Sequence, residues 1–458
     1  MTIAWKKYDE KKMKELREFN NGYKAFISDC KTERECVTEG IRIAKEYGYV
    51  DLKDFIAQKK ELKAGDKVYY DNMGKTLSLF HIGTKPLEAG LNILGAHVDS
   101  PRIDLKPNPL YEAKDLAFFK THYYGGIKKY QWVTLPLAMH GVVIKKDGTK
   151  VNIVIGEDDS DPVIGITDLL IHLSAEQMTK TAAKVIEGED LNVTVGNIPL
   201  ADSEKDAVKA NIAKMLKEKY DIEEEDFVSA EIEIVPAGKA RDYGLDRSMV
   251  MGYGQDDRVC AYTSLMALMH TDTMEKTSCA LFVDKEEVGS IGATGMHSRF
   301  FEHILVEMLE LSGGYSELKL RRLYSNTDVL SSDVSVGYDP TFPNVCEANN
   351  TAYLGHGMCI SKYTGARGKS GCNDANAEFV ARVRNAFDKH DVSFQSAELG
   401  KVDAGGGGTI AYIMAQYNMN VIDAGVPVLS MHAPWEITSQ VDVYEAYKGY
   451  IAFLKEMK

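Results

Sequence analysis

Hydrophobic and polar positions follow two different periods in the first hundred residues of this chain. Residues 10–50 carry apolar side chains at helical spacing, which predicts two amphipathic helices. The stretch GDKVYYDNMGKTLSLFHIG, 65–83, alternates with a period of two around an Asn-Met-Gly turn and predicts a β-hairpin. LNILGAHVDSP, 91–101, is a short apolar run that stops at polar residues. This run is typical of a buried strand that brings His97 to the edge of a sheet.

The pattern changes between 103 and 245, where strand-like runs dominate. VTLPLAMHGVVIKKDGTKVNIVIGE predicts strands joined at a Lys-Asp-Gly turn, and SEKDAVKANIAKMLKEKY predicts one surface helix. We therefore expect 103–245 to be an inserted β-rich domain.

After this insertion, strands and helices alternate, with SCALFVD as a strand and a helix expected from about residue 293. Such alternation predicts an α/β fold whose mixed, largely parallel sheet is sandwiched by helices. Residues 1–102 and 246–458 together would form this domain, because the run at 91–98 has the same buried strand character.

Charge and composition exclude several classes of protein. The 458 residues carry a formal charge of −14 without a basic cluster, which argues against a nucleic-acid partner. No apolar run reaches the roughly 18 residues of a membrane span, and the polar start of the chain lacks the apolar core of a signal peptide. Seven cysteines without a CxxC pair predict reduced thiols in a cytoplasmic protein.

Polar residues recur near the carboxyl ends of the predicted strands, where open α/β sheets hold their ligands. They are His97 with Asp99, Asp256 with Asp257, Glu286 with Glu287, Asp333, and His432. Each could serve alone as a helix cap, a turn or a buried polar side chain. Two imidazoles and several carboxylates, with no cysteine among them, make a donor set for Zn²⁺, Co²⁺ or Mn²⁺. The combination therefore predicts a metal site.

Spacing within two of these pairs refines the prediction. His97 and Asp99 are two apart on an extended chain and face the same side, so Asp99 can accept a hydrogen bond from one imidazole nitrogen while the other binds metal. Glu286 and Glu287 are adjacent and would point opposite ways on an extended chain. We expect one glutamate to bind metal and the other to reach the attacking water.

Six motifs carry a family resemblance that runs in order over nearly the whole chain. They are AHVDSPRIDLKP, GQDDRVCAYTSL, FVDKEEVGSIGATG, SSDVSVGYDP, GGGGTIAYIMA and SMHAPWEI. They resemble the aspartyl aminopeptidase and yeast vacuolar aminopeptidase I family of two-metal aminopeptidases. The resemblance implies hydrolysis of the N-terminal residue from peptides with a free N-terminus, by a water that two divalent ions activate. Zinc is the first expectation for these ions, with cobalt or manganese as alternatives.

The resemblance also assigns roles to individual residues. Asp256 would bridge the two ions, and Asp257 would support the site or cap the helix. His97 and Asp333 would complete one ion, and Glu287 and His432 the other. Glu286 would be the general base. The inserted domain would build dimers and, in many members, a dodecamer.

Five further positions match substrate-binding residues of similar enzymes. His356 and Lys362 would line the substrate pocket, and Gly407 and Gly408 in a glycine-rich turn would approach a substrate carbonyl or carboxylate. His172 would reach the active site of a neighbouring subunit. The chain reads YTGARGKSGCND where relatives often carry an Asn-Gln-Arg-Tyr type sequence. This departure leaves the preferred N-terminal residue open.

Other functions remain as alternatives. A related deacylase or carboxypeptidase would clamp a substrate carboxylate with arginine and would usually carry a different insertion. A glycosidase could use two carboxylates but would leave the histidines without a role. An inactive scaffold would have lost the base or a ligand, and every one of these residues is present.

Overall fold

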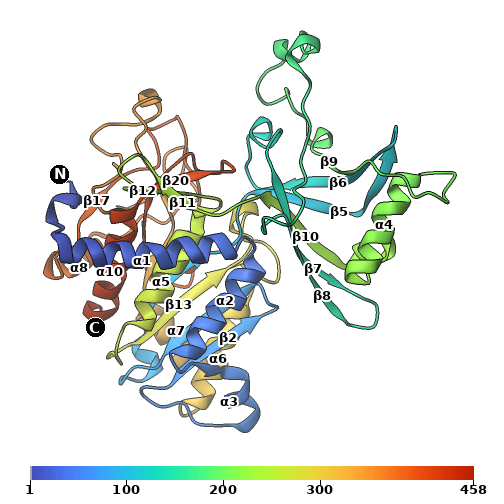
Figure 1. Ribbon diagram of the computed structural model, residues 1–458. Coiled ribbons are helices and arrows are strands. Elements are labelled where there is room, and N and C mark those ends of the chain that lie inside the picture. The colour runs from blue at the N-terminus through green and yellow to red at the C-terminus, as the bar shows by residue number, and fades with distance from the viewer. Residues whose placement is uncertain (1–2) are drawn as a thin grey trace. The chain divides into compact units, whose positions relative to one another are not determined.

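A computed structural model describes residues 3–458, which divide into two compact units (Figure 1). One unit comprises residues 3–99, Ala240–Met431 and Glu436–Lys458, and the other comprises Ser100–Lys239 and His432–Trp435. The chain thus leaves the first unit once for a long excursion and once for a segment of four residues.

The predicted elements of the first hundred residues are confirmed. Helix α1, Glu10–Asp29, begins where the Asp9 side chain accepts a hydrogen bond from the Lys12 backbone N–H. Helix α2, Glu33–Glu46, begins with a capping box that satisfies two of its otherwise unpaired backbone donors. Strands β2, Lys67–Asn72, and β3, Thr76–His81, form the expected antiparallel hairpin.

A mixed sheet of nine strands organises the first unit. Its order is β1 (Val50–Asp51), β2, β3, β13 (Thr277–Val283), β4 (Leu91–His97), β14 (Asp328–Ser331), β18 (Asn420–Gly425), β16 (Met358–Ser361) and β17 (Phe394–Ser396). The central strands β13, β4, β14 and β18 run parallel, so their carboxyl ends meet at one edge of the sheet. This parallel centre within a mixed sheet confirms the predicted fold class.

Two hydrophobic cores lie on opposite faces of this sheet. Alternate residues of β4 enter the two cores, as the two-residue period of a strand requires: Leu94 and Ala96 pack in one, and Leu91 and Ile93 in the other. Helices α1, α2, α5 (Gln255–Met269), α8 (Ala377–Lys389) and α10 (Gln440–Glu456) contribute to the first core. Helices α3 (Leu52–Gln58), α6 (Phe300–Leu311), α7 (Glu317–Ser325) and α9 (Ala411–Ala415) contribute to the second.

The helix expected from about residue 293 begins later, at Phe300. The intervening chain forms a tight loop in which the Ser290 N–H donates to the Lys285 carbonyl at 2.6 Å. Positive φ angles at Gly289 and Gly292 bend the backbone away from a helix. The expectation of an earlier start was therefore wrong.

The first unit also contains a smaller sheet of five short strands, all of which follow the long excursion in the chain. Its order is β11 (Arg241–Tyr243), β12 (Met249–Gly252), β20 (Glu436–Ser439), β19 (Pro427–Leu429) and β15 (Ser335–Val336). Strand β12 precedes α5 and strand β20 precedes α10. Both of these core helices thus begin shortly after a strand of this sheet.

The second unit is built on an antiparallel sheet of six strands. Its order is β8 (Lys150–Ile155), β7 (Leu137–Ile144), β10 (Ala230–Pro236), β5 (Arg102–Ala113), β6 (Leu116–Tyr124) and β9 (Val193–Gly196). Helix α4, Ala207–Tyr220, matches the predicted surface helix. Apolar side chains are exposed along 163–178, notably Ile171 and Leu173, with 68% and 69% of their surface accessible.

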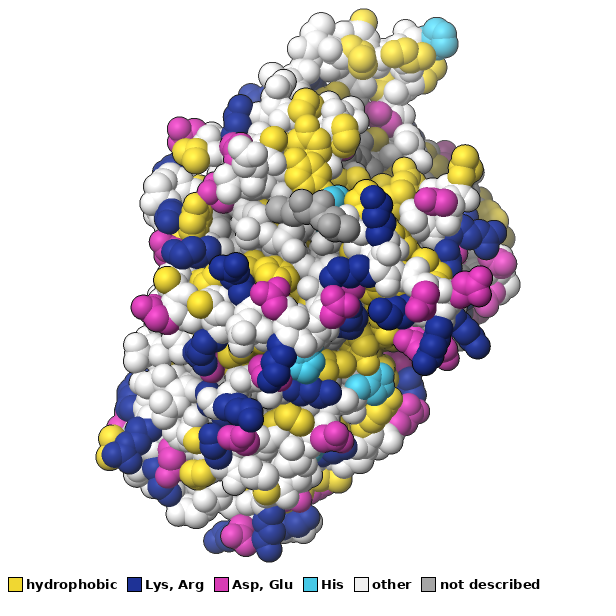
Figure 2. Space-filling model, turned by 90° about the vertical axis from the view of Figure 1, so that its left-hand side faces the viewer, with side chains coloured by type: hydrophobic (Ala, Val, Ile, Leu, Met, Phe, Trp, Pro, Cys, Tyr) yellow, Lys and Arg dark blue, Asp and Glu magenta, His cyan; other side chains and the backbone are white. Residues whose placement is uncertain are grey.

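On the face drawn in Figure 2, Lys and Arg side chains lie interspersed with Asp and Glu side chains. Among the helices of residues 3–458, none is long and apolar enough to cross a membrane.

Candidate metal centre

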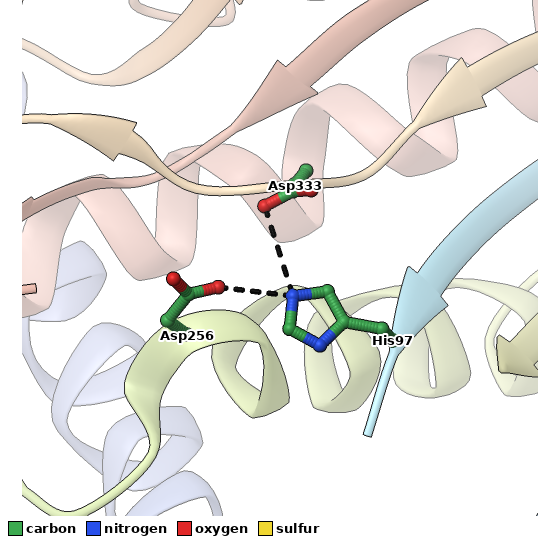
Figure 3. Close-up of side chains that lie close together, drawn as sticks. All are labelled: His97, Asp256 and Asp333. Carbon is green, nitrogen blue, oxygen red and sulfur yellow. Dashed lines mark hydrogen bonds and ion pairs between the residues drawn. The ribbon is translucent and has the colours of Figure 1, made fainter. Parts of the chain in front are cut away.

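Three segments distant in the sequence bring His97, Asp256 and Asp333 together at the carboxyl edge of the sheet (Figure 3). His97 is the last residue of β4, and Asp333 follows the neighbouring parallel strand β14 by two residues. Asp256 lies in the first turn of α5 and is joined to Asp257 by a cis peptide bond. His97 Nε2 lies 3.0 Å from Asp256 Oδ1 and 4.0 Å from Asp333 Oδ1.

These three residues fit a divalent ion. Two atoms that bind one tetrahedral zinc ion at about 2.1 Å lie about 3.4 Å from each other. The distances from the His97 imidazole to the two carboxylates, 3.0 and 4.0 Å, bracket this value. One imidazole nitrogen with carboxylate oxygens is also a donor set that suits zinc, cobalt and manganese.

Asp99 connects His97 to the glutamate pair. The Asp99 carboxylate accepts backbone N–H donors from Glu286 and Glu287, both at 3.1 Å. His97 Nδ1 lies 2.9 Å from the backbone carbonyl of Asp99 and 3.4 Å from its carboxylate. The imidazole Nδ1 therefore lies closer to the backbone carbonyl of Asp99 than to the Asp99 carboxylate, which was the expected partner. The carboxylate instead accepts the backbone N–H groups of the glutamate turn.

The two glutamates lie on a short 3-10 turn, Glu286–Val288, and not on an extended chain. Positive φ angles at Lys285 and Gly289 close this turn on both sides. The inference that the two side chains point opposite ways was therefore wrong in its premise. Both come near the imidazole of His97: the three residues form a second group of possible ligands, with Glu286 Oε2 4.0 Å from His97 Nε2.

Negative charge is concentrated and buried at this edge. Burial raises the pKa of Asp333 well above its ordinary value, and the charges of Asp256 and Glu286 act in the same direction. Burial also raises the pKa of Asp257, whose carboxylate accepts the His97 backbone N–H at 3.3 Å. Burial alone would lower the pKa of His97, but its contacts with Asp256 and Asp99 outweigh burial and raise this pKa. A bound cation would offset the repulsion among these carboxylates.

Sequence reasoning missed one buried carboxylate beside the centre. Glu436, with 1% of its surface accessible, accepts the backbone N–H of Asp256 at 3.1 Å through Oε2. Glu436 stands in the motif SMHAPWEI, so the sequence contained a signal without showing its contact. This hydrogen bond holds the backbone at the residue expected to bridge two ions.

The structure places His432 in the short segment that groups with the second unit. Its Nδ1 lies 2.9 Å from the carbonyl oxygen of Gly126, in the same unit, and its φ is positive. Its role as a metal ligand stays a prediction.

The two residues expected to line one substrate pocket lie at opposite ends of β16. His356 precedes this strand and Lys362 follows it, so about six residues, or roughly 20 Å of extended chain, separate them. Lys362 forms an ion pair with Asp374, which also binds Lys369 at 2.9 Å. Lys362 further lines a cavity of about 480 Å³, whose other walls include Ile360, Phe394 and Arg384.

The remaining substrate-binding candidates lie in two loops. The Gly407 N–H donates to the Thr364 carbonyl at 3.3 Å, so this amide is already engaged within the chain. Gly408 precedes α9, and a Cβ at this position would lie 3.8 Å from the Tyr412 ring. His172 is exposed on the 3-10 turn Ile171–Leu173 of the second unit and is therefore not a buried structural histidine.

Comparison with known proteins identifies the family. The model of the family described as aminopeptidase I zinc metalloprotease (M18) matches residues 26–454. The chain belongs to this M18 family. A probable M18 family aminopeptidase 1 of Clostridium acetobutylicum is 63% identical over 452 residues, which cover 98% of this chain and 97% of that protein. M18 members are zinc aminopeptidases, and this chain is therefore an aminopeptidase.

Solved structures show the same fold. The structure of an M18 family aminopeptidase from Thermotoga maritima has a TM-score of 0.95 at 46% identity, with 99% of each chain covered. Aminopeptidase I from Clostridium acetobutylicum has a TM-score of 0.93 at 60% identity, also with 99% of each chain covered. A dodecamer of the Saccharomyces cerevisiae enzyme has a TM-score of 0.76 at 20% identity over 95% of this chain and 96% of that chain, a likeness of fold alone.

Proposed function

We propose that this M18 member is an aminopeptidase with two divalent ions per subunit and with Glu286 as its general base. The observation that carries the proposal is the cluster of His97, Asp256 and Asp333, with the Glu286 carboxylate 4.0 Å from His97 Nε2. A base must lie within reach of the attacking water but outside the set of ligands. Zinc is the first candidate, because the family is one of zinc metalloproteases.

The residues divide into two sets of ligands. Asp256 would bridge the two ions, His97 and Asp333 would complete the ligands of one ion, and Glu287 and His432 would complete those of the other. Two such ions, when bound, lower the pKa of water, polarise the scissile carbonyl and receive the substrate's free amino group. The last property confines cleavage to the N-terminal peptide bond.

Glu286 moves the proton in this scheme. Its carboxylate takes a proton from the attacking water and then gives it to the nitrogen of the leaving residue. Asp99 keeps Glu286 in place, because it binds the backbone N–H groups of both glutamates. Lys285 and Gly289, with positive φ, give the turn the shape that Asp99 can hold.

We further propose that the inserted domain, predicted at 103–245, assembles copies of the chain. Support comes from the exposed apolar side chains along 163–178, which a monomer would leave in water. The similar fold of the yeast dodecamer supports a dimer-based homo-oligomer. His172 lies in this exposed segment, where it could reach the active site of another copy.

A reducing compartment fits the cysteines. All seven cysteines are free in the structure, and five of them are buried. Free buried thiols in a chain of this size are typical of proteins that work in the cytoplasm. We propose that location for this enzyme.

A panel of substrates tests the function. The metal-free protein is reconstituted with Zn²⁺, Co²⁺ or Mn²⁺ and given dipeptides and aminoacyl p-nitroanilides that differ in the first residue, including Asp, Glu, Leu and Lys. We expect release of the N-terminal residue, loss of activity with a chelator, and recovery with metal. Activity only on N-acylated substrates or at the C-terminus would favour the deacylase or carboxypeptidase alternative. A folded, metal-loaded protein without turnover would favour a scaffold.

A further inference from the structure

A polar pair between the loop that follows Glu286 and helix α9 is not used by the proposed mechanism. His297 Nε2 and the Tyr412 hydroxyl lie 2.8 Å apart, with their ring centroids at 5.7 Å. His297 belongs to the loop that follows the glutamate turn, where its backbone N–H donates to the Ser290 carbonyl at 3.1 Å. Tyr412 belongs to α9, directly after the glycine-rich turn. The pair thus joins two segments that frame the carboxyl edge of the sheet.

Packing holds α9 at this edge. A Cβ at Gly95 would lie 3.2 Å from Ile410 Cδ1, so the start of α9 rests on β4 two residues before His97. The Thr409 hydroxyl donates to Asp423 at 2.6 Å, which ties the same turn to β18. The position of Tyr412 is therefore set by the strands that position the metal centre.

The Tyr412 hydroxyl is a donor at neutral pH. Burial raises its pKa above the ordinary value, and the negative charge of Glu286 raises it further. Tyr412 remains partly accessible and His297 is exposed, so a ligand can reach the pair.

We propose that Tyr412, held by His297, binds the residue that follows the scissile bond, by donating a hydrogen bond to its carbonyl or carboxylate oxygen. This inference rests on the proposed function. Glu286 returns a proton to the leaving nitrogen, so the leaving residue lies on the side of Glu286. A donor on that side meets the next acceptor of the peptide, which is the oxygen of the leaving residue.

His297 is a positioning residue in this arrangement. When its Nε2–H donates to the phenol oxygen, the Tyr412 O–H is left to donate to the substrate. Glutamine at position 297 would retain an amide donor, whereas leucine would remove it. His297→Gln should therefore preserve more of the peptide selectivity than His297→Leu.

Three substrates with the same first residue X test the inference. The dipeptide X-Gly offers a carboxylate, X-Gly amide offers a carbonyl, and X-p-nitroanilide offers neither at that position. A neutral hydrogen bond contributes about three- to tenfold in affinity. For Tyr412→Phe we expect KM for both peptides to rise by about this factor, with a clearly smaller change for the anilide. A loss on X-Gly alone would identify the carboxylate as the ligand, and equal losses on both peptides would identify the carbonyl oxygen that they share.

A binding measurement separates recognition from turnover. Calorimetry compares the affinity of Glu286→Gln for X-Gly with that of the double variant Glu286→Gln, Tyr412→Phe, and we expect weaker binding by the double variant. Tyr417→Phe, whose ring packs on Tyr324 beyond the end of α9, is the matched control and should keep the wild-type selectivity. Equal losses on peptides and anilide, or equal affinities in calorimetry, would overturn this inference alone. A wild-type protein without peptidase activity would overturn the proposed function and this inference with it.

Discussion

Replacing the two adjacent glutamates one at a time gives the most direct test of the proposed mechanism. In Glu286→Gln the backbone N–H that Asp99 accepts at 3.1 Å is unchanged, and the amide has nearly the shape of the carboxylate. The turn should therefore keep its fold. The amide cannot take a proton from water, so only the transfer of the proton is lost.

The size of the effect follows from the role. General acid–base catalysis contributes roughly 10²- to 10⁴-fold to rate, which is about 3 to 5.5 kcal/mol of transition-state stabilisation. We expect kcat of Glu286→Gln to fall by this factor while the metal content stays near two ions per subunit. The metal content is measured by elemental analysis after gel filtration, and kcat by steady-state kinetics on the best substrate of the panel.

Glu287→Gln is the matched control, because it removes the same charge one residue away. Its amide is a poorer ligand than a carboxylate, so metal content should fall at limiting zinc and activity should return in part at high zinc. Equal loss of metal in both variants would refute the division into one base and one ligand. Retention of most activity by Glu286→Gln would refute its role as the base.

Three further changes probe other parts of the structure. Burial raises the pKa of Asp423 from 3.8 to about 6, so ionisation of this side chain lowers the stability of the fold as the pH rises from about 4 to about 6, and the loss is complete above that range. Asp423→Asn should remove this penalty of up to about 3 kcal/mol at pH 7. The measurement is urea unfolding at several pH values, where the stability of the variant should depend less on pH. Gly295→Ala would place a Cβ 2.3 Å from the Ser290 carbonyl oxygen and should therefore shift the loop that follows Glu286. We expect kcat to fall by about 100-fold with little change in the circular dichroism spectrum. An unaltered kcat would show that the loop does not position the base. Ile171→Asp puts a charge on a side chain that is 68% exposed, so an assembly built on this segment should dissociate in light scattering, whereas an unchanged mass would exclude the segment from the interface.

The periodic parts of the fold were predictable because local physics decides them. Helices α1 and α2, the β2–β3 hairpin and strand β4 follow from side-chain spacing and from turn residues that the chain carries in place. The start of α6 was not predictable in this way. Apolar spacing around 293 resembles a helix, but the positive φ of Gly289 and Gly292 belongs to a loop that is held by contacts with other segments.

In the candidate site, too, some features were predictable from the sequence and others appear only in the structure. Residue chemistry and motif order nominated His97, Asp256 and Asp333, and the structure brings these three within ligand distance. It also shows Glu436 on the backbone of Asp256, which no spacing rule could indicate across 180 positions. His356 and Lys362 lie at opposite ends of strand β16, and their role in substrate binding stays a prediction.

The sequence by itself determined the periods, the order of the motifs and the set of donor atoms, because these are properties of residues and their near neighbours. Only the tertiary structure decided that Asp99 holds the glutamate turn through its carboxylate and meets His97 through its carbonyl. Likewise only the tertiary structure paired His297 with Tyr412. Such contacts arise when parallel strands end at one edge and loops close over it, so their geometry depends on how distant segments pack and not on any local pattern.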